Sequence, residues 1–334
     1  MKCVLVTGAA GFIGSHLSEA LVKRGYQVYG VDNLQTGRLS NLKNLENERH
    51  FKFINLDVNE ILENSDLQKI NFSGILHLAA LADIVPSIEH PIKYFNSNVA
   101  GTLKVVEFVR ALKIPRLVYA ASSSCYGIAE DYPTSEKSRI QLEYPYALTK
   151  YMGEEIILHW SKVYGFSATS LRLFNVFGLR SRTSGSYGAV FGVFLAQKLA
   201  GKPLTIVGDG SQSRDFTHVS DVVNAFVSSL EVETSENTRI YNVGSGRTQT
   251  VSYLAKLIGG PTVPLPKRPG EPDITFADIT KIKAELGWNP NQKFEDGVLE
   301  LLENIDQFKD APVWDVKSIE RATDVWFKRL SKES

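Results

Sequence analysis

The chain has 334 residues, of which 43% are apolar and 22% are charged, and its 37 lysines and arginines equal its 37 aspartates and glutamates. This composition is typical of a globular protein, and the length predicts one large domain with a smaller companion, or two domains. A net charge of zero argues against a nucleic-acid partner bound through its phosphates.

Only two cysteines are present, Cys3 and Cys125, which are too few for a disulfide framework and favour a reducing compartment. The apolar run at the N-terminus ends at Thr7 and Gly8, so it is too short for a signal peptide or a membrane span. We therefore expect a cytoplasmic protein without a membrane partner. The six histidines show no metal-ligand spacing, so no metal is expected.

A short apolar run at residues 4–6 predicts a strand, which is followed by a glycine-rich turn and a helix over residues 15–23. Gly8 permits a tight turn, Gly11 lets the backbone approach a pyrophosphate, and Gly14 lets the helix pack closely on the strand. By itself this glycine trio is a weak signal, because it also occurs in an ordinary strand-to-helix turn.

The second predicted strand, residues 27–31, makes the glycine motif a specific indication of a dinucleotide site. It ends in Asp32, at about the distance where a carboxylate would meet the adenosine ribose of a dinucleotide. A carboxylate there accepts hydrogen bonds from both ribose hydroxyls and repels a 2′-phosphate, so NAD is favoured over NADP. Arg38, a nearby cation, is the feature that favours NADP.

Strand-like and helical segments then alternate, and the strands are apolar on both faces, which specifies a doubly wound parallel sheet. Asp57 and Val58 follow a strand where a side chain would meet adenine, and the small residues from Ala79 to Ala82 let the backbone come close to a dinucleotide. The further predicted strands are residues 51–55, 74–78, 116–121 and 167–172, with a helix over residues 98–112.

The strand over residues 116–121 ends in Ser122-Ser123-Ser124. Ligands of such sheets bind outside the carboxyl ends of the strands. These serines therefore either hydrogen-bond a substrate or cap a turn before the next segment, and the local sequence favours neither interpretation.

The helix predicted over residues 146–164 begins with Tyr146-Ala-Leu-Thr-Lys150. Residues four apart share a helix face, so the Lys150 ammonium can lie beside the Tyr146 phenol and favour its ionised form. The pKa of the phenol would then fall from about 10 toward neutrality, where it can act as a base. Alone the pattern is weak, because a tyrosine four residues before a lysine often arises by chance on a solvated helix.

From about residue 179, arginines and glycines gather among short elements and predict a lid over a nucleotide site. Arg214 and Arg268 are candidate ligands of a diphosphate, although solvated surface arginines would give the same pattern. Residues 281–286 and 294–308 are predicted as closing helices, and residues 314–330 as a helix that docks on the body or on a partner subunit, without assigned chemistry. The other lid residues are Arg180, Arg182, Gly185, Gly188, Gly208 and Gly210.

Several motifs together carry a family likeness over essentially the whole chain. They are Thr7-Gly-Ala-Ala-Gly-Phe-Ile-Gly14, Asp32-Asn33, Ser122 with Tyr146 and Lys150, Arg172-Leu-Phe-Asn-Val-Phe-Gly178, Ser213-Arg-Asp-Phe-Thr-His-Val219 and Arg268-Pro-Gly-Glu271. The chain resembles the extended short-chain dehydrogenase/reductases, in particular the NAD-dependent nucleotide-sugar epimerase/dehydratase group.

The resemblance implies a Rossmann-type α/β fold with a smaller C-terminal α/β domain. Residues 1–178 would form mainly the NAD-binding domain, and residues 179–334 mainly the nucleotide-sugar domain, with some exchange of chain between them. The resemblance also implies polysaccharide biosynthesis as the setting and a homodimer, in which the helices over residues 98–112 and 146–164 pair as a four-helix bundle.

In this group a phenolate removes the proton of the sugar 4-hydroxyl, a lysine lowers the pKa of that phenol and holds the nicotinamide ribose, and a serine hydrogen-bonds the same sugar oxygen. The resemblance assigns these catalytic roles to Tyr146, Lys150 and Ser122. The NAD contacts expected from the strand ends and from the resemblance are Gly8, Gly11, Phe12, Ile13, Gly14, Asp32, Asn33, Asp57, Val58, Leu78, Ala79, Ala80, Ala82, Asn98, Tyr146 and Lys150.

The fate of the resulting 4-keto sugar depends on the two residues after Ser122. Members similar to 4,6-dehydratases carry an Asp-Glu pair there, and the decarboxylases usually carry a Glu at the second position, whereas this chain has Ser123 and Ser124. Hydroxyls of high pKa cannot readily act as acid and base, so the pattern favours 4-epimerisation. A 4,6-dehydratase or 4-dehydrogenase is the alternative, and a non-catalytic NAD-binding module is a more remote one.

The triple serine looks like that of the UDP-N-acetylglucosamine and UDP-glucuronate 4-epimerases. Asn175 resembles the hexose and hexosamine enzymes, and Thr275 matches a wall position that is a bulky Tyr in epimerases restricted to unsubstituted hexoses. The smaller residue leaves room for an N-acetyl group, so a UDP-N-acetylhexosamine is the expected substrate, with UDP-glucuronate or UDP-glucose as the other candidates. The expected substrate contacts are Ser123, Ser124, Asn175, Arg214, Arg268 and Thr275.

Overall fold

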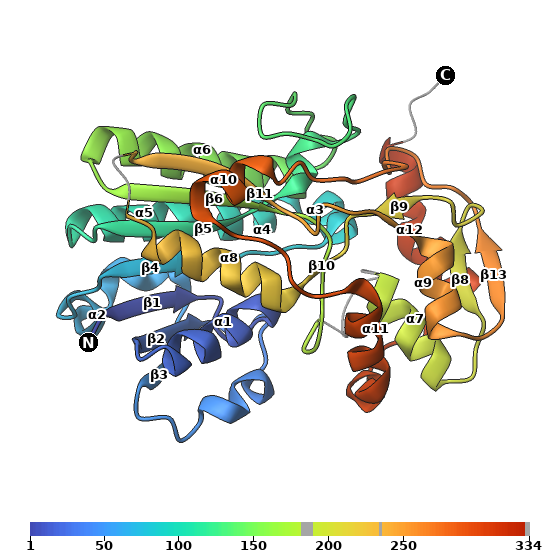
Figure 1. The fold of residues 1–334 in the computed structure, drawn as a ribbon, viewed down its shortest axis with the longest axis horizontal. Helices are drawn as coiled ribbons and strands as arrows, with labels where there is room; N and C mark the ends of the chain where they lie inside the picture. Colours follow the sequence, from blue (N-terminus) through green and yellow to red (C-terminus); the bar gives the residue numbers. More distant parts are fainter. Residues whose placement is uncertain (182–189, 234–235, 331–334) are drawn as a thin grey trace.

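The computed structural model describes residues 1–181, 190–233 and 236–330, which form a large layered body and a smaller unit beside it (Figure 1). The predicted lid residues Arg182, Gly185 and Gly188 lie outside the described residues. The centre of the body is a seven-stranded sheet in the order β11-β6-β5-β4-β1-β2-β3, and every neighbouring pair is parallel. The predicted doubly wound parallel sheet is therefore confirmed.

The sheet strands are short apolar segments whose side chains are buried. Val4, Leu5 and Val6 of β1, an inner strand, are fully buried, as expected for a strand covered on both faces. The last strand comes from the second half of the chain and pairs with its neighbour so that Tyr241 lies opposite Leu171. The bounds are β1 (Cys3–Thr7), β2 (Gln27–Asp32), β3 (Phe51–Asn55), β4 (Gly74–His77), β5 (Arg116–Ser122), β6 (Ser167–Leu173) and β11 (Thr238–Val243).

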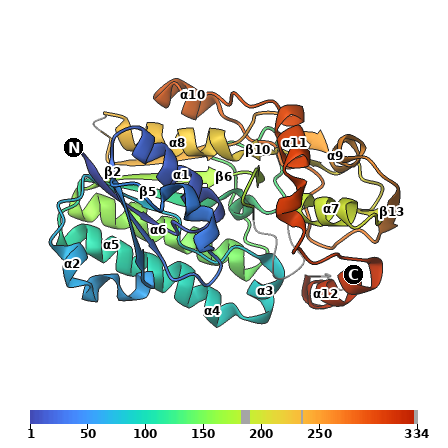
Figure 2. The ribbon, with the colours of Figure 1, turned by 90° about the horizontal axis from the view of Figure 1, so that it is seen from below.

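Helices cover both faces of the sheet and give three layers (Figure 2). One face is covered by α1 (Phe12–Lys23) and α8 (Val219–Glu231), which share an apolar core with the sheet. The other is covered by α5 (Gly101–Ala111) and α6 (Pro145–Tyr164), which form a second core with it, while the short α2 (Ser65–Gln68) lies on the same side.

Two helices begin earlier than their apolar periodicity predicts. Gly11, in extended conformation, is the N-cap of α1, so Phe12 and Ile13 belong to the helix rather than to the preceding turn. The predicted helix over residues 98–112 is preceded by α4 (Pro91–Phe95), and a π-helical turn at Asn96–Ala100 joins α4 to α5. Proline suits the first turn of a helix, because an N–H there has no partner within the helix.

The smaller unit has its own apolar core, in which Phe177, Phe191, Phe216 and Phe294 pack ring against ring. Strands β8 and β13 pair in parallel, and α7, α9 and α11 surround them (Figure 1). The predicted helix over residues 294–308 ends at Glu303 and continues after Asn304 as a 3₁₀ turn. The bounds are α7 (Val190–Leu199), β8 (Leu204–Val207), α9 (Val251–Ile258), β13 (Thr262–Leu265) and α11 (Phe294–Glu303).

Short elements connect the two parts. Strand β7 pairs with β10 in parallel, and β9 pairs with β12 in the antiparallel direction. Within the described ranges, no helix combines the length and the apolarity needed to cross a bilayer. The bounds of these short strands are β7 (Val176–Phe177), β9 (Ser213–Arg214), β10 (Thr217–His218) and β12 (Gln249–Thr250), and the remaining helices are α3 (Ile84–Glu89), α10 (Thr280–Leu286) and α12 (Val316–Leu330).

Candidate functional site

A cavity of about 1280 Å³ lies at the carboxyl ends of the central strands. Its walls come from the turns that follow β1, β2, β4, β5 and β6 and from segments of the smaller unit. It brings together almost all of the residues predicted to bind a dinucleotide or a substrate, namely Gly8, Gly11, Phe12, Ile13, Gly14, Asp32, Asn33, Asp57, Val58, Leu78, Ala79, Ala80, Ala82, Ser122, Ser123, Ser124, Tyr146, Lys150, Asn175, Arg214, Arg268 and Thr275.

The glycine turn after β1 is packed so tightly that side chains would not fit. Gly8 has a φ of +71°, and a Cβ atom there would lie 2.8 Å from the Ala79 nitrogen. A Cβ at Gly14 would lie 2.0 Å from the Gly8 carbonyl oxygen, closer than any non-bonded contact allows. The turn therefore leaves the start of α1 open toward the cavity, where backbone N–H groups favour a negative charge.

Polar side chains after β2 and β3 form the rim of the cavity. The Asp32 carboxylate accepts hydrogen bonds from the backbone N–H groups of Ala10 (3.0 Å) and Leu34 (2.8 Å), while burial raises its pKa. Asn33 donates to the Asp57 carboxylate at 2.8 Å. Burial opposes ionisation of Asp57, but hydrogen bonds from Asn59 and Asn33 hold its pKa below the ordinary value.

Asn98 is the exception among the predicted dinucleotide contacts, because it does not line the cavity. Its fully buried amide accepts the Leu81 N–H at 2.7 Å and donates to the Leu81 carbonyl at 3.0 Å and to the Thr149 hydroxyl at 3.1 Å. Asn98 lies in the π-helical turn, and its amide fixes the backbone at Leu81. Its contact with NAD stays a prediction.

Tyr146 and Ser122 meet although they come from α6 and β5. A hydrogen bond from Ser122 to the phenol lowers the pKa of Tyr146, but burial outweighs it and the net pKa is raised. Ser124 donates to the Ser122 oxygen through its backbone N–H (3.2 Å) and its hydroxyl (2.8 Å). The interpretation of the serines as a cap is confirmed, since Ser122 caps the 3₁₀ turn Ser123–Tyr126. Hydrogen bonding of these serines to a substrate stays a prediction.

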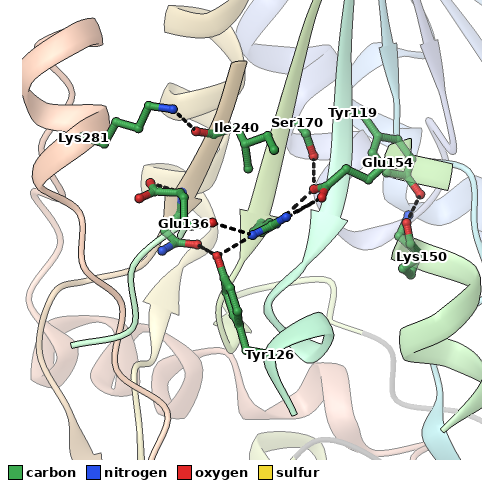
Figure 3. A network of polar contacts seen from close by, with 10 residues as sticks. Tyr119, Tyr126, Glu136, Lys150, Glu154, Ser170, Ile240 and Lys281 are labelled. Carbon is green, nitrogen blue, oxygen red and sulfur yellow. Dashed lines mark hydrogen bonds and ion pairs between the residues drawn. The ribbon is translucent and has the colours of Figure 1, made fainter. Parts of the chain in front are cut away.

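Lys150 is buried one helical turn after Tyr146. Its ammonium lies over the Tyr119 ring, 4.1 Å from the ring centroid, and the Tyr119 hydroxyl donates to the Lys150 carbonyl at 3.2 Å (Figure 3). Burial lowers the pKa of Lys150 to about 7, and the Glu154 carboxylate opposes that shift. The predicted lowering of the Tyr146 pKa is thus not what the structure shows, because burial disfavours the charged form of both partners.

On the opposite wall, the two candidate phosphate ligands share one acid. Glu271 forms an ion pair with Arg214 at 2.9 Å and with Arg268 at 3.5 Å, and all three residues line the cavity. The interpretation of these arginines as solvated surface residues is therefore wrong. Of the other lid residues that are described, Arg180 pairs with Glu19 on α1, and neither it nor Gly208 or Gly210 lines the cavity.

Asn175 and Thr275, separate clues in the sequence, are in direct contact. The Thr275 hydroxyl donates to the Asn175 side-chain oxygen at 2.8 Å and accepts the Asp215 N–H at 3.1 Å. Both hydrogen bonds hold the Thr275 side chain in the cavity wall, beside Asn175.

Comparison with known proteins agrees with this geometry. Residues 4–244 match the NAD dependent epimerase/dehydratase family. The chain belongs to this family. It is 34% identical over 306 residues to UDP-glucose 4-epimerase of Mycolicibacterium smegmatis, in an alignment that covers 90% of this chain and 97% of that enzyme.

Two solved structures of similar proteins carry ligands. One is UDP-N-acetylglucosamine 4-epimerase from Methanobrevibacter ruminantium M1 with UDP-N-acetylmuramic acid (TM-score 0.83, 31% identity, 92% of this chain and 98% of that chain). The other is UDP-glucuronic acid 4-epimerase from Bacillus cereus with UDP-glucuronic acid and NAD (TM-score 0.83, 31% identity, 91% and 99%). The family resemblance predicted from the motifs is confirmed.

The residues at the strand ends of this epimerase/dehydratase family member fit NAD, the coenzyme of the family. The space that side chains at Gly8 and Gly14 would fill is the cradle that a pyrophosphate requires, and the Asp32 carboxylate stands at the end of β2. The prediction of NAD is confirmed. Among the described residues, no group of three or more His, Cys, Asp or Glu side chains is placed to hold a metal ion.

A buried polar network, not singled out from the sequence, fixes the helix that carries Tyr146 and Lys150 (Figure 3). Glu154, also on α6, accepts hydrogen bonds from Ser170 (2.6 Å) and from the Arg172 guanidinium (2.6 Å to Nη2). Arg172 also donates to the Tyr126 hydroxyl at 2.9 Å. Breaking such a buried pair is strongly destabilising, because one charge then stays without a partner.

Two further aromatic residues, which were not among the predicted site residues, line the cavity. Tyr144 stacks on Tyr146, with ring centroids 6.4 Å apart and planes 5° apart. Trp326 reaches the cavity from α12, the helix to which the sequence assigned no chemistry. The position of Tyr144 two residues before Tyr146 could have suggested its role, but nothing local relates Trp326 to the site.

Proposed function

We propose that the chain is an NAD-dependent UDP-sugar 4-epimerase that interconverts UDP-N-acetylglucosamine and UDP-N-acetylgalactosamine through a transient 4-keto sugar. The observation that carries the proposal is one cavity in which the Tyr146–Ser122 pair faces a glycine cradle for a dinucleotide and an arginine pair for a diphosphate. The similarity to three 4-epimerases of UDP-sugars supports it.

The residues around the sugar 4-hydroxyl have complementary roles. Tyr146 takes the hydroxyl proton as the ketone forms and returns it after the sugar has turned over. Ser122 donates a hydrogen bond to the same oxygen, and the two hydrogen bonds from Ser124 orient the Ser122 hydroxyl for that purpose. Lys150 holds the nicotinamide ribose. NAD, when bound, supplies the acceptor and the donor of hydride at C4.

The positions after Ser122 argue for re-reduction of the ketone. Loss of a C6 hydroxyl requires an acid and a base near C5 and C6, and Ser123 and Ser124 supply only hydroxyls there. The wall around Thr275 favours an N-acetylated sugar, because its side chain is small and directed to Asn175. UDP-glucuronate and UDP-glucose are the competing substrates.

The test is a product assay with a panel of UDP-sugars. Incubation with UDP-N-acetylglucosamine should give the isomer with an axial 4-hydroxyl, identified by NMR after chromatography, in larger yield per unit time than UDP-glucose or UDP-glucuronate gives. Accumulation of a 6-deoxy-4-keto sugar without the axial isomer would instead establish a 4,6-dehydratase. Faster conversion of UDP-glucuronate would move the substrate assignment to that sugar.

We also propose that the enzyme is a homodimer built on α5 and α6. These helices pack on each other, and α4, α5 and α6 expose the large apolar residues Ile92, Phe95, Leu103 and Leu148. Such exposed apolar surface on neighbouring helices is typical of an interface. Sedimentation equilibrium should give twice the mass of the chain. A cytoplasmic location and a role in polysaccharide biosynthesis remain predictions from the sequence.

A further inference from the structure

The C-terminal helix α12 is anchored at both ends beside the cavity. Before it begins, the Trp314 carbonyl accepts a hydrogen bond from the buried Gln197 side chain at 2.7 Å. The Asp315 carboxylate then accepts the Ser318 N–H at 2.7 Å and caps the first turn. The helix packs against α3 of the large body (Figure 2), so it spans from the core of the smaller unit to the coenzyme side.

One face of α12 is buried against the rest of the protein. Ile319, Thr323 and Trp326, at the spacing of one helix face, are each at most 5% exposed. Charged residues such as Lys317 and Asp324 occupy the solvent side. This burial shows that α12 is an integral part of the fold, and it fixes the position of Trp326 in the C-terminal half of the helix.

Two aromatic rings, those of Tyr144 and Trp326, lie between the candidate base and a candidate phosphate ligand. The Trp326 Nε1–H donates to the Pro269 carbonyl at 2.7 Å, and the Arg268 guanidinium lies 5.7 Å from the centre of the indole. Its ring centroid is 6.4 Å from that of Tyr144, which in turn stacks on Tyr146. The sugar of a nucleotide sugar must lie in this interval, because it links the diphosphate to the hydroxyl that Tyr146 deprotonates.

We infer that Trp326 is a substrate-binding residue whose indole forms an apolar wall against the sugar, an inference that rests on the proposed function. The C–H face of a pyranose ring packs well on a flat aromatic surface, and a few polar groups around such a wall set the orientation of the ligand. The indole is hydrogen-bonded to the Pro269 carbonyl, and Pro269 is next to Arg268 in the chain. The sugar wall and the phosphate ligand are therefore held together, and α12 supplies the wall.

The inference is tested by kinetics on Trp326→Ala and Trp326→Phe, with Phe327→Ala as the matched control. Phe327 is half-buried on the same helix and does not line the cavity. Trp326→Ala should raise KM for the UDP-sugar about tenfold or more, with kcat and the bound NAD close to wild type, because buried tryptophans dominate the contacts of many binding sites. Trp326→Phe should raise KM less, and Phe327→Ala should leave it unchanged.

Fluorescence supplies a readout that does not require turnover. The other tryptophans, Trp160, Trp288 and Trp314, do not line the cavity, so a change in emission on adding a UDP-sugar should come from Trp326 and should disappear in Trp326→Phe. If Trp326→Ala does not fold, Trp326→Phe alone is compared with the wild type, both in the kinetics and in the fluorescence titration.

The outcomes separate this inference from the proposed function. A wild-type KM in both Trp326 variants, with the emission change retained in Trp326→Phe, would refute the contact while the epimerase stands. An equal rise of KM in Phe327→Ala would reduce Trp326 to a structural role and would also refute it. A wild-type enzyme that converts no UDP-sugar, but whose emission change on UDP-sugar binding is lost in Trp326→Phe, would overturn the reaction and keep the contact.

Discussion

The two ends of the cavity are built in different ways. The coenzyme end consists of turns that directly follow the strands, and its central feature, the contact of Gly14 with the Gly8 carbonyl, joins residues six apart in the chain. The proposed sugar end is assembled from Asn175, Arg214, Thr275 and Trp326, which lie on separate segments. A change at the coenzyme end strains backbone that cannot move, whereas a change at the sugar end replaces one side chain among several.

The most severe change should be Tyr146→Phe, at the junction of the two ends. Without the phenol oxygen no group takes the 4-hydroxyl proton, so kcat should fall by about 10²- to 10⁴-fold. Bound NAD, measured by absorbance after denaturation, should stay at the wild-type level. Tyr151→Phe on the same helix is the control and should keep its activity. Retained turnover in Tyr146→Phe would exclude the phenol as the base.

The next largest effect is expected for Gly14→Ala, which tests the rigidity of the coenzyme end. The new Cβ would meet the Gly8 carbonyl oxygen at 2.0 Å, and overpacking of this kind costs about 1–3 kcal/mol. We expect a lower melting temperature and little bound NAD. In the control Gly25→Ala, the added Cβ has no neighbour within 4 Å, so only the unfavourable φ of +83° remains. Equal NAD content in both variants would contradict the tight packing.

Thr275→Tyr tests whether one larger side chain at the sugar end lowers turnover of one substrate without abolishing activity. The larger ring should narrow the space beside Asn175 and selectively suppress turnover of the N-acetylated substrate. Pocket discrimination of this kind is worth about 1–3 kcal/mol, or roughly 10- to 200-fold in kcat/KM, relative to UDP-glucose. The ratio of kcat/KM for the two substrates is the measurement. An unchanged ratio would remove Thr275 from the specificity argument.

The smallest expected effect concerns His77, the buried support below the coenzyme end. His77 contacts the Thr7 and Thr102 hydroxyls at 2.7 and 3.0 Å, and burial lowers its pKa to about 3. Below the ordinary pKa of about 6.5 the unfolded chain binds a proton that the folded chain does not, so stability falls as the pH drops from 6.5 toward 3.

Between pH 7.5 and 5.5, the wild type should lose about 1.4 kcal/mol more unfolding free energy than His77→Gln, measured by urea denaturation at both values. Parallel losses in the two proteins would show that His77 is protonated in the folded state.

The surroundings of Tyr146 could be predicted only in part from the sequence. The spacing of Tyr146 and Lys150 predicts one helix face, and α6 confirms that spacing. The predicted lowering of the Tyr146 pKa was wrong, because burial raises that pKa and burial depends on elements far apart in sequence. The position of Asn98 behind the cavity wall did not follow from the sequence for a similar reason, since its amide is held by Leu81 and Thr149, which lie on other segments.

The sequence by itself determined the layered parallel fold and the glycine cradle with Asp32, and it predicted Ser122, Tyr146 and Lys150 as the catalytic residues. Each of these depends on residues a few positions apart, or on the rule that parallel strands end at one edge of the sheet. Only the tertiary structure decided that Glu271 lies between Arg214 and Arg268, that Thr275 bonds to Asn175, and that Trp326 enters the cavity. Apart from the pair of Arg268 and Glu271, which are three residues apart, these contacts join distant segments, and no local periodicity records them.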